Sequence, residues 1–197
     1  MRWDPRCFPC LLSRVSLECT LCNADTALSR RVRDECERML NDLKERPLLH
    51  PEVASALHRH AYGMLGTRDP FFALKEESTK KALEVCRTVR PRLKTFRDFV
   101  TAAVIGNTFD FGVLSHSVEP DFARYFEHEF AEGLFIDDTD RILPLTDRVV
   151  YFTDNCGEIV FDRLLIEVLG PERITLMVKG GPIVNDVLAE DITQVGL

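Results

Sequence analysis

The first hundred residues carry apolar residues at helical spacing. Three runs show it, residues 25–43, 53–65 and 72–89, with many charged residues between the apolar ones and a glycine or proline soon after each run. Residues three and four apart share one face of a helix, so these runs predict amphipathic helices. We therefore expect a mainly helical N-terminal domain over residues 1–100.

The pattern changes after residue 148 to short apolar runs on either side of an amphipathic segment. The runs Val149–Thr153 and Ile174–Val178 are rich in β-branched residues, and Gly157–Leu169 lies between them. This order is typical of a parallel strand–helix–strand unit, because parallel strands need a connection long enough to hold a helix. The sequence thus predicts an α/β fold, with a parallel α/β domain over residues 101–197.

The end of the chain predicts the start of a further unit. After Gly180-Gly181-Pro182, a second helix is expected to begin near Asn185 and Asp186. Two parallel strands do not form a stable sheet alone. We therefore expect either further strands upstream or a chain that is incomplete at its C-terminus.

Composition and charge narrow the class of protein. With 197 residues, 45% of them hydrophobic and 29% charged, the chain has the composition of a folded protein. Its net charge of -7 argues against nucleic-acid binding, which needs a basic surface. No apolar stretch approaches the roughly 18 residues that cross a membrane, and the N-terminus lacks the apolar core of a secretion signal. We expect a cytoplasmic protein without membrane partners, and nothing in the sequence indicates its oligomeric state.

Polar residues follow both predicted strands. Asp154 and Asn155 come directly after the first strand, and Lys179 comes after the second, ahead of Asp186. The carboxyl ends of neighbouring parallel strands meet at one edge of a sheet, where α/β proteins bind ligands. Carboxylate and amide oxygens are hard ligands, so Asp154, Asn155 and Asp186 could bind Mg²⁺ or Mn²⁺ together, with Lys179 offsetting phosphate charge. The alternative is that these residues only cap the helices that follow.

Two further polar features lie in this half of the chain. Gly157 permits a tight turn into the next helix, whose free N-terminal N–H groups predict an anion site, with Glu158 in the first turn. The stretch GNTFDFG, which contains Asn107 and Asp110, predicts a polar loop. Its residue chemistry alone indicates a glycine-bracketed turn.

Four cysteines form two CxxC pairs near the N-terminus, Cys7, Cys10, Cys19 and Cys22. Four thiols satisfy tetrahedral zinc, although the gap between the pairs is shorter than in common zinc ribbons. The alternative is ordinary buried or surface thiols. His58 and His60 lie two apart on a predicted helix, so they point to different faces and are expected on the surface.

Several motifs occur in a specific order along the chain. They are Cys7-Phe8-Pro9-Cys10-Leu11-Leu12, Asp69-Pro70-Phe71 with Leu74-Lys75, Gly106-Asn107 with Asp110 and Gly112, Asp154-Asn155 with Gly157-Glu158 and Asp162, and Lys179 with Pro182, Asn185-Asp186 and Glu190-Asp191. Together they resemble the damage-control phosphatases, metal-dependent phosphatases formerly catalogued as a domain of unknown function. The resemblance spans nearly the whole chain, and the CxxC start is similar to the stand-alone, mainly archaeal-type branch.

The resemblance implies a catalytic centre and a fold. It implies that a divalent ion, manganese, nickel, cobalt or magnesium, is bound by Asp154, Asn155 and Asp186. It also implies a substrate site, to which we assign Glu158, Asn107, Asp110, Lys179 and Asn185. The implied fold is a helical N-terminal domain plus a Rossmann-like α/β domain. The implied function is metal-dependent hydrolysis of phosphomonoesters of small damaged or surplus phosphometabolites, such as sugar phosphates.

The chain also departs from the family pattern. Family members continue past the position of Leu197 into a segment that helps to hold the phosphate, so the resemblance implies that this chain lacks it. Cys156 stands where the family more often has alanine or serine, and Cys19-x-x-Cys22 is not a family motif.

The sequence is also compatible with two other functions. A zinc-stabilised or redox-sensing binding module could be built on the N-terminal cysteine pairs. A methyltransferase acting on protein carboxylates is proposed for relatives, but the glycine-rich nucleotide loop that such an enzyme would show after its first strand is absent here.

Overall fold

The protein consists of two compact units, seen in a computed structural model that describes residues 4–108 and 122–197. Unit 1 comprises Met1–Phe72 with Pro182–Val184, and unit 2 comprises Ala73–Gly181 with Asn185–Leu197. The chain passes from one unit to the other at residue 72, whereas the sequence pattern places the change at residue 100. The difference arises because two helices before and around residue 100 contribute to the core of unit 2.

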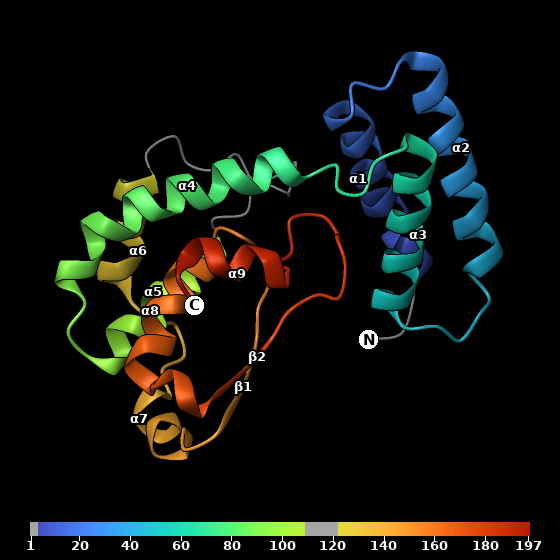
Figure 1. Cartoon of the computed structure of the whole chain (residues 1–197). Helices are drawn as coiled ribbons and strands as arrows, with labels where there is room; N and C mark the ends of the chain where they lie inside the picture. The colour runs from blue at the N-terminus through green and yellow to red at the C-terminus, as the bar shows by residue number, and fades with distance from the viewer. Residues whose placement is uncertain (1–3, 109–121) are drawn as a thin grey trace. The chain divides into compact units, whose positions relative to one another are not determined.

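Unit 1 is a bundle of three helices that lie side by side (Figure 1). They are α1 (Phe8–Leu21), α2 (Thr26–Leu43) and α3 (His50–Leu65), after a short 3-10 turn at Pro5–Cys7. Their apolar faces meet in a core that includes Val15, Val32, Cys36, Leu40, Val53 and Leu57. The sequence prediction of helices at α2 and α3 is confirmed, and α1 covers the segment that holds both cysteine pairs.

A buried carboxyl–imidazole pair lies inside this helical bundle. Glu18 on α1 and His58 on α3 are 0% and 2% exposed, and a carboxylate oxygen of Glu18 contacts Nδ1 of His58. Burial raises the pKa of Glu18, although His58 acts in the opposite direction. The expectation of a surface position for His58 is therefore wrong, because Glu18 supplies the partner that a buried imidazole needs.

Unit 2 contains helices on a small parallel sheet. Its helices are α4 (Phe72–Val89), α5 (Phe96–Asn107), α6 (Phe122–Glu132), α7 (Thr139–Ile142), α8 (Ile159–Leu169) and α9 (Ala189–Val195), with 3-10 turns at Arg90–Arg92, Leu143–Leu145 and Pro171–Arg173. Its strands are β1 (Val149–Phe152) and β2 (Ile174–Met177).

The two strands pair in parallel, as the sequence predicts, and Phe152 lies beside Met177 at the end of the ladder. The helix α8 is the crossover between them. Side chains alternate along the strands, so Tyr151 and Ile174 pack against the core while Val150, Phe152 and Met177 are exposed. The predicted α/β class is confirmed, with helix as the dominant element.

The core of unit 2 forms around α8. Phe161 on α8 stacks on Phe126 of α6, with ring centroids 5.5 Å apart, and α5 packs along α8. The helix α4 joins them through Thr79, whose hydroxyl donates to the carbonyl of Cys156 at 3.1 Å. These contacts assign α4 and α5 to unit 2, although their sequence pattern is that of the preceding helices.

The contact between α5 and α8 depends on a glycine. A Cβ added at Gly106 would lie 2.8 Å from Cδ2 of Phe161 and 3.0 Å from its Cβ and Cγ. We expect Gly106→Ala to lower the free energy of unfolding by about 1–3 kcal/mol, because overpacking forces the two helices apart. Urea unfolding measures this change.

The matched control is Gly63→Ala on α3. Gly63 lies inside a helix, and a Cβ added there meets nothing within 4 Å. Alanine should therefore raise the free energy of unfolding by up to about 1 kcal/mol through helix propensity alone. Equal effects at the two glycines would contradict the close packing of α5 on α8.

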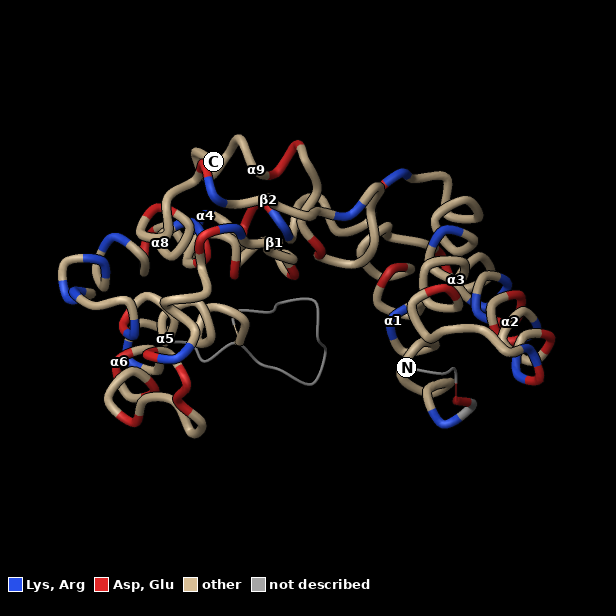
Figure 2. Tube along the Cα trace, turned by 90° about the horizontal axis from the view of Figure 1, so that it is seen from below, with Lys and Arg blue, Asp and Glu red and all other residues tan. Residues whose placement is uncertain are grey.

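Charged residues of both signs are spread over the helices of each unit (Figure 2). In the described part of the chain, no helix has both the length and the apolar character required to cross a membrane.

Candidate active site

The loop after β1 is organised by Asn155. Its side chain is almost fully buried, and its Oδ1 accepts hydrogen bonds from the N–H groups of Gly157 and Glu158, both at 2.9 Å. Its backbone carbonyl accepts from the N–H of Ile159 at 3.2 Å. The N–H groups at the start of α8 are thus already bonded, so the open anion site expected from the sequence is not formed there. Asn155 thus holds the turn that leads into α8, and these contacts do not decide between the two roles expected from the sequence, capping and metal binding.

The segment around Asp186 is extended and pairs with this loop. The N–H of Cys156 donates to the carbonyl of Asn185 at 3.1 Å, and the N–H of Val187 donates to the carbonyl of Asp154 at 2.8 Å. Asn155 and Asp186 therefore face each other as an antiparallel pair. In such a non-hydrogen-bonded pair the Cα atoms are about 4.5 Å apart.

The expectation that a helix begins near Asn185 and Asp186 is wrong, because α9 begins only at Ala189. Val187 and Leu188 are 0% and 4% exposed. Burying these two apolar neighbours favours pairing with the β1 loop over an amphipathic helix at this point.

Asn107 joins two acidic side chains of the loop. It is the last residue of α5, so it lies in a helix and not in the predicted polar loop. Its Nδ2 donates to Oδ2 of Asp154 at 3.1 Å and to Oε2 of Glu158 at 2.8 Å. Its backbone carbonyl accepts from Nδ2 of Asn155 at 3.3 Å. Four of the residues assigned from the sequence thus form one hydrogen-bonded cluster.

Three more assigned residues lie outside this cluster. Asp186 contacts Lys179, with 3.2 Å between Nζ and Oδ2, and Lys179 is half exposed. Asn185 is buried, and its carbonyl anchors the N–H of Cys156. Asp110 lies outside the described residues.

The four N-terminal cysteines do not form a zinc site. Cys7 precedes α1 and Cys22 follows it, and a 14-residue helix is roughly 21 Å long, too far for one ion to bind all four thiols. No group of three or more His, Cys, Asp or Glu side chains in residues 4–108 and 122–197 is placed to hold a metal. A cation at the strand ends would therefore need amide oxygens beside its carboxylates.

Asp162 is a buried acidic residue whose pKa is raised first by burial and then by the nearby carboxylates of the site. It lies on α8 with 1% exposure, and its Oδ1 accepts from the hydroxyl of Tyr151 at 2.7 Å. Burial and then Glu158 raise its pKa from 3.8 to about 8, Asp154 adds to the rise, and the Tyr151 hydrogen bond opposes it. The sequence gives one signal of this role, an acidic residue inside the apolar run Ile159–Ile166.

The raised pKa of Asp162 predicts a pH-dependent stability of the metal-free protein. Between about pH 4 and pH 8 the folded state holds a proton that the unfolded state has lost, so the free energy of unfolding falls as pH rises, by up to about 1.4 kcal/mol per unit. Asp162→Asn should remove this fall. Urea unfolding from pH 5 to 8 with a chelator measures it, and parallel curves for the two proteins would contradict the prediction.

A pocket opens beside the cluster. It has a volume of about 350 Å³ and is lined by Val100, Ala103, Val104, Asn107, Tyr151, Glu158 and Leu165. Asn107 and Glu158 thus belong to both the pocket and the hydrogen-bonded cluster. A ligand in this pocket would lie against the same two polar side chains.

The donor chemistry fits a hard divalent cation. Asp154 and Asp186 supply carboxylates, and Asn107 and Asn155 supply amide oxygens. A cation there would offset the negative charges of Glu158 and Asp154, which add to the effect of burial on the pKa of Asp162. The oxygen of Asn155 is used by two N–H groups, so it could join a coordination shell only by giving up part of its capping role.

The fold and site define an α/β protein with an acidic and amide-rich site at its strand ends. A family model described as the damage-control phosphatase ARMT1-like domain matches residues 3–196. A damage-control phosphatase of Archaeoglobus fulgidus is 36% identical over 203 residues, which cover 97% of this chain and 69% of that protein. The chain belongs to this family.

Two further comparisons concern Pyrococcus horikoshii. Its damage-control phosphatase PH1575 is 29% identical over 204 residues, covering 100% of this chain and 70% of that protein. The crystal structure of PH1575, described as a DUF89 family protein, matches with a TM-score of 0.86 over 100% of this chain and 71% of that one.

Proposed function

We propose that the protein is a metal-dependent phosphatase that hydrolyses phosphomonoesters of small phosphometabolites, such as damaged or surplus sugar phosphates. The observation that carries the proposal is the cluster in which Asn107 contacts Asp154 and Glu158 at the end of a parallel strand. Membership of the damage-control phosphatase family supports the reaction class.

Asp154 and Asp186 would hold a divalent ion, with Asn155 or Asn107 completing its oxygen shell. When bound, manganese, nickel, cobalt or magnesium polarises a phosphoryl group and lowers the pKa of a bound water. The chain's own residues fix the geometry. Nδ2 of Asn107 donates to the carboxylates of both Asp154 and Glu158, and the pairing of Asn155 with Asp186 joins the two strand ends.

Substrate binding would use the polar residues around the cluster. Glu158 and Asn107 face the 350 Å³ pocket, which would take the organic part of the substrate. Lys179, next to Asp186, would balance the negative charge of the phosphoryl group, and Asn185 would support the loop beneath it. Residue Asp110 is assigned to the same site by resemblance alone.

A substrate screen tests the proposal. The purified protein is stripped of metal with a chelator and assayed for phosphate release from p-nitrophenyl phosphate and a panel of sugar phosphates, with and without each divalent ion. We expect hydrolysis that returns only with metal. Equal phosphate release with and without metal would contradict the metal dependence. If none of the phosphoesters is hydrolysed under any condition, the proposed phosphatase activity is contradicted.

A further inference from the structure

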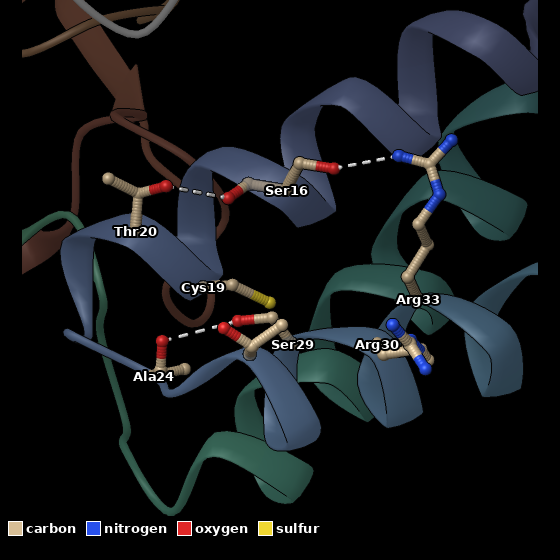
Figure 3. Close-up of a pocket in the computed structure, with 8 residues that line it drawn as sticks. Ser16, Cys19, Thr20, Ala24, Ser29, Arg30 and Arg33 are labelled. Atoms are coloured by element: carbon tan, nitrogen blue, oxygen red, sulfur yellow. Dashed lines mark hydrogen bonds between the residues drawn. The ribbon is translucent and has the colours of Figure 1, made fainter.

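A second pocket lies in unit 1, between α1 and α2. It has a volume of about 380 Å³ and is lined by Ser16, Cys19, Thr20, Ala24, Thr26, Ser29, Arg30 and Arg33. In Figure 3, Ser16, Cys19 and Thr20 come from α1, while Ser29, Arg30 and Arg33 come from the facing helix α2. All these residues belong to unit 1, whereas the residues of the candidate active site belong to unit 2.

Three arginines lie close together on this part of α2, and three acidic residues, Asp34, Glu35 and Glu37, follow them. Arg30, Arg31 and Arg33 fall within four consecutive positions. Among the described residues, no carboxylate lies within 4.0 Å of any of these three guanidinium groups. Each arginine has an acidic residue four positions later, Asp34, Glu35 or Glu37, and forms no ion pair with it, while Glu35 pairs with Arg38.

The helix itself adds to the positive potential. The first turn of α2 contains no acidic residue, and the amino end of a helix carries a partial positive charge. Asp25 caps the helix by accepting from the N–H of Leu28 at 2.7 Å. The arginines begin with Arg30, the fifth residue of α2, so they lie just beyond this end of the helix.

The pocket is also partly preorganised. Nη1 of Arg33 donates to Oγ of Ser16 at 3.1 Å, which directs the guanidinium across the pocket toward α1 (Figure 3). Ser16 in turn donates to the carbonyl of Leu12 at 2.9 Å. The other N–H groups of Arg33 remain available to a ligand. Burial raises the pKa of the Cys19 thiol, so this side chain adds no negative charge.

We propose that this pocket is an anion site that binds the phosphoryl group of a small molecule through Arg30 and Arg33. Two guanidinium groups one helical turn apart offer a charge of +2 and planar sets of N–H donors, which match the charge and oxygens of a phosphate dianion better than those of a single carboxylate. The inference does not depend on the proposed hydrolytic activity.

Isothermal titration calorimetry with inorganic pyrophosphate tests the proposal. The protein is used in excess chelator and carries Asp154→Ala, so that metal-dependent binding in unit 2 is absent. We expect saturable binding, weakened by roughly tenfold or more in Arg30→Ala/Arg33→Ala, because each lost guanidinium removes charge-assisted hydrogen bonds. Both arginines are exposed, and a thermal melt checks that the double variant stays folded.

The control is Arg38→Ala, which removes one charge from the same helix outside the pocket, where Arg38 pairs with Glu35. Binding should be kept in this variant and partly kept in Arg30→Lys/Arg33→Lys. The proposal is overturned if pyrophosphate does not bind, if Arg30→Ala/Arg33→Ala binds as before, or if Arg38→Ala weakens binding equally, since the effect would then be one of overall charge.

Discussion

Replacing Asp154 by alanine should reduce metal-stimulated phosphoester hydrolysis by roughly 100-fold or more, because a carboxylate assigned to the ion is lost. The same change removes the acceptor that Asn107 contacts at 3.1 Å, which leaves the amide bonded to Glu158 alone. Asp154 is exposed, so the fold should tolerate the substitution. Values of kcat/KM for p-nitrophenyl phosphate at saturating metal measure the loss.

Asp147→Ala is the matched control for this experiment. Asp147 is also exposed and lies two residues before β1, at the opposite end of the strand from Asp154. Its replacement should leave kcat/KM within about twofold, since the charge is far from the cluster and screened by solvent. Full activity of Asp154→Ala would refute its role, and an equal loss in both variants would show only a general effect of charge.

Lys75→Met should give the largest loss of stability that we expect from a single side chain of unit 2. Lys75 on α4 is 4% exposed and contacts Oδ2 of Asp191 at 2.8 Å. The same oxygen accepts from the N–H of Leu188 at 2.8 Å, at the start of α9. Methionine keeps most of the packing but leaves a poorly solvated carboxylate, at a cost of about 3 kcal/mol in the free energy of unfolding.

An exposed ion pair on the same helix is the control that separates the effect of burial on stability from the effect of charge alone. Lys81 pairs with Glu77 one turn away on α4, but the two side chains are 48% and 58% exposed. Lys81→Met should therefore cost less than about 0.5 kcal/mol. Lys75→Met/Asp191→Asn should recover part of the loss, because the unpaired charge is gone. Urea unfolding measures the free energy of unfolding of each variant. Similar losses for Lys75→Met and Lys81→Met would contradict a stabilising buried pair between Lys75 and Asp191.

The strands and the helix between them could be predicted because local pattern and tertiary role agree. Val149–Phe152 is a continuous apolar run, Ile174–Met177 is apolar except for Thr175, and the α8 segment has one face that covers the sheet. The extended segment at Asn185–Leu188 could not be predicted from the sequence. Its conformation depends on pairing with the loop after β1 and not on a periodic pattern of apolar residues within the segment. Local signals favour a helix there, and burial of Val187 overrides them.

Several residues that the sequence assigns to the site lie close together in the structure, but their contacts could be predicted only in part. Asp154, Asn155 and Glu158 are marked by their place after a strand, and the structure brings them together. Asn107 comes to them from α5, about fifty positions earlier, and no sequence spacing indicates such a contact. The cap formed by Asn155 shows why residue type alone left capping and metal binding open: the same amide oxygen serves either purpose.

The central claim is that the carboxylates of Asp154 and Asp186 share one divalent ion. Anomalous diffraction from a crystal soaked in Mn²⁺ tests it most directly, because the ion is located without reference to activity. We predict one strong peak between the two carboxylates, absent in Asp186→Ala. A manganese peak elsewhere on the protein, or no peak between Asp154 and Asp186 at saturating Mn²⁺, would contradict it.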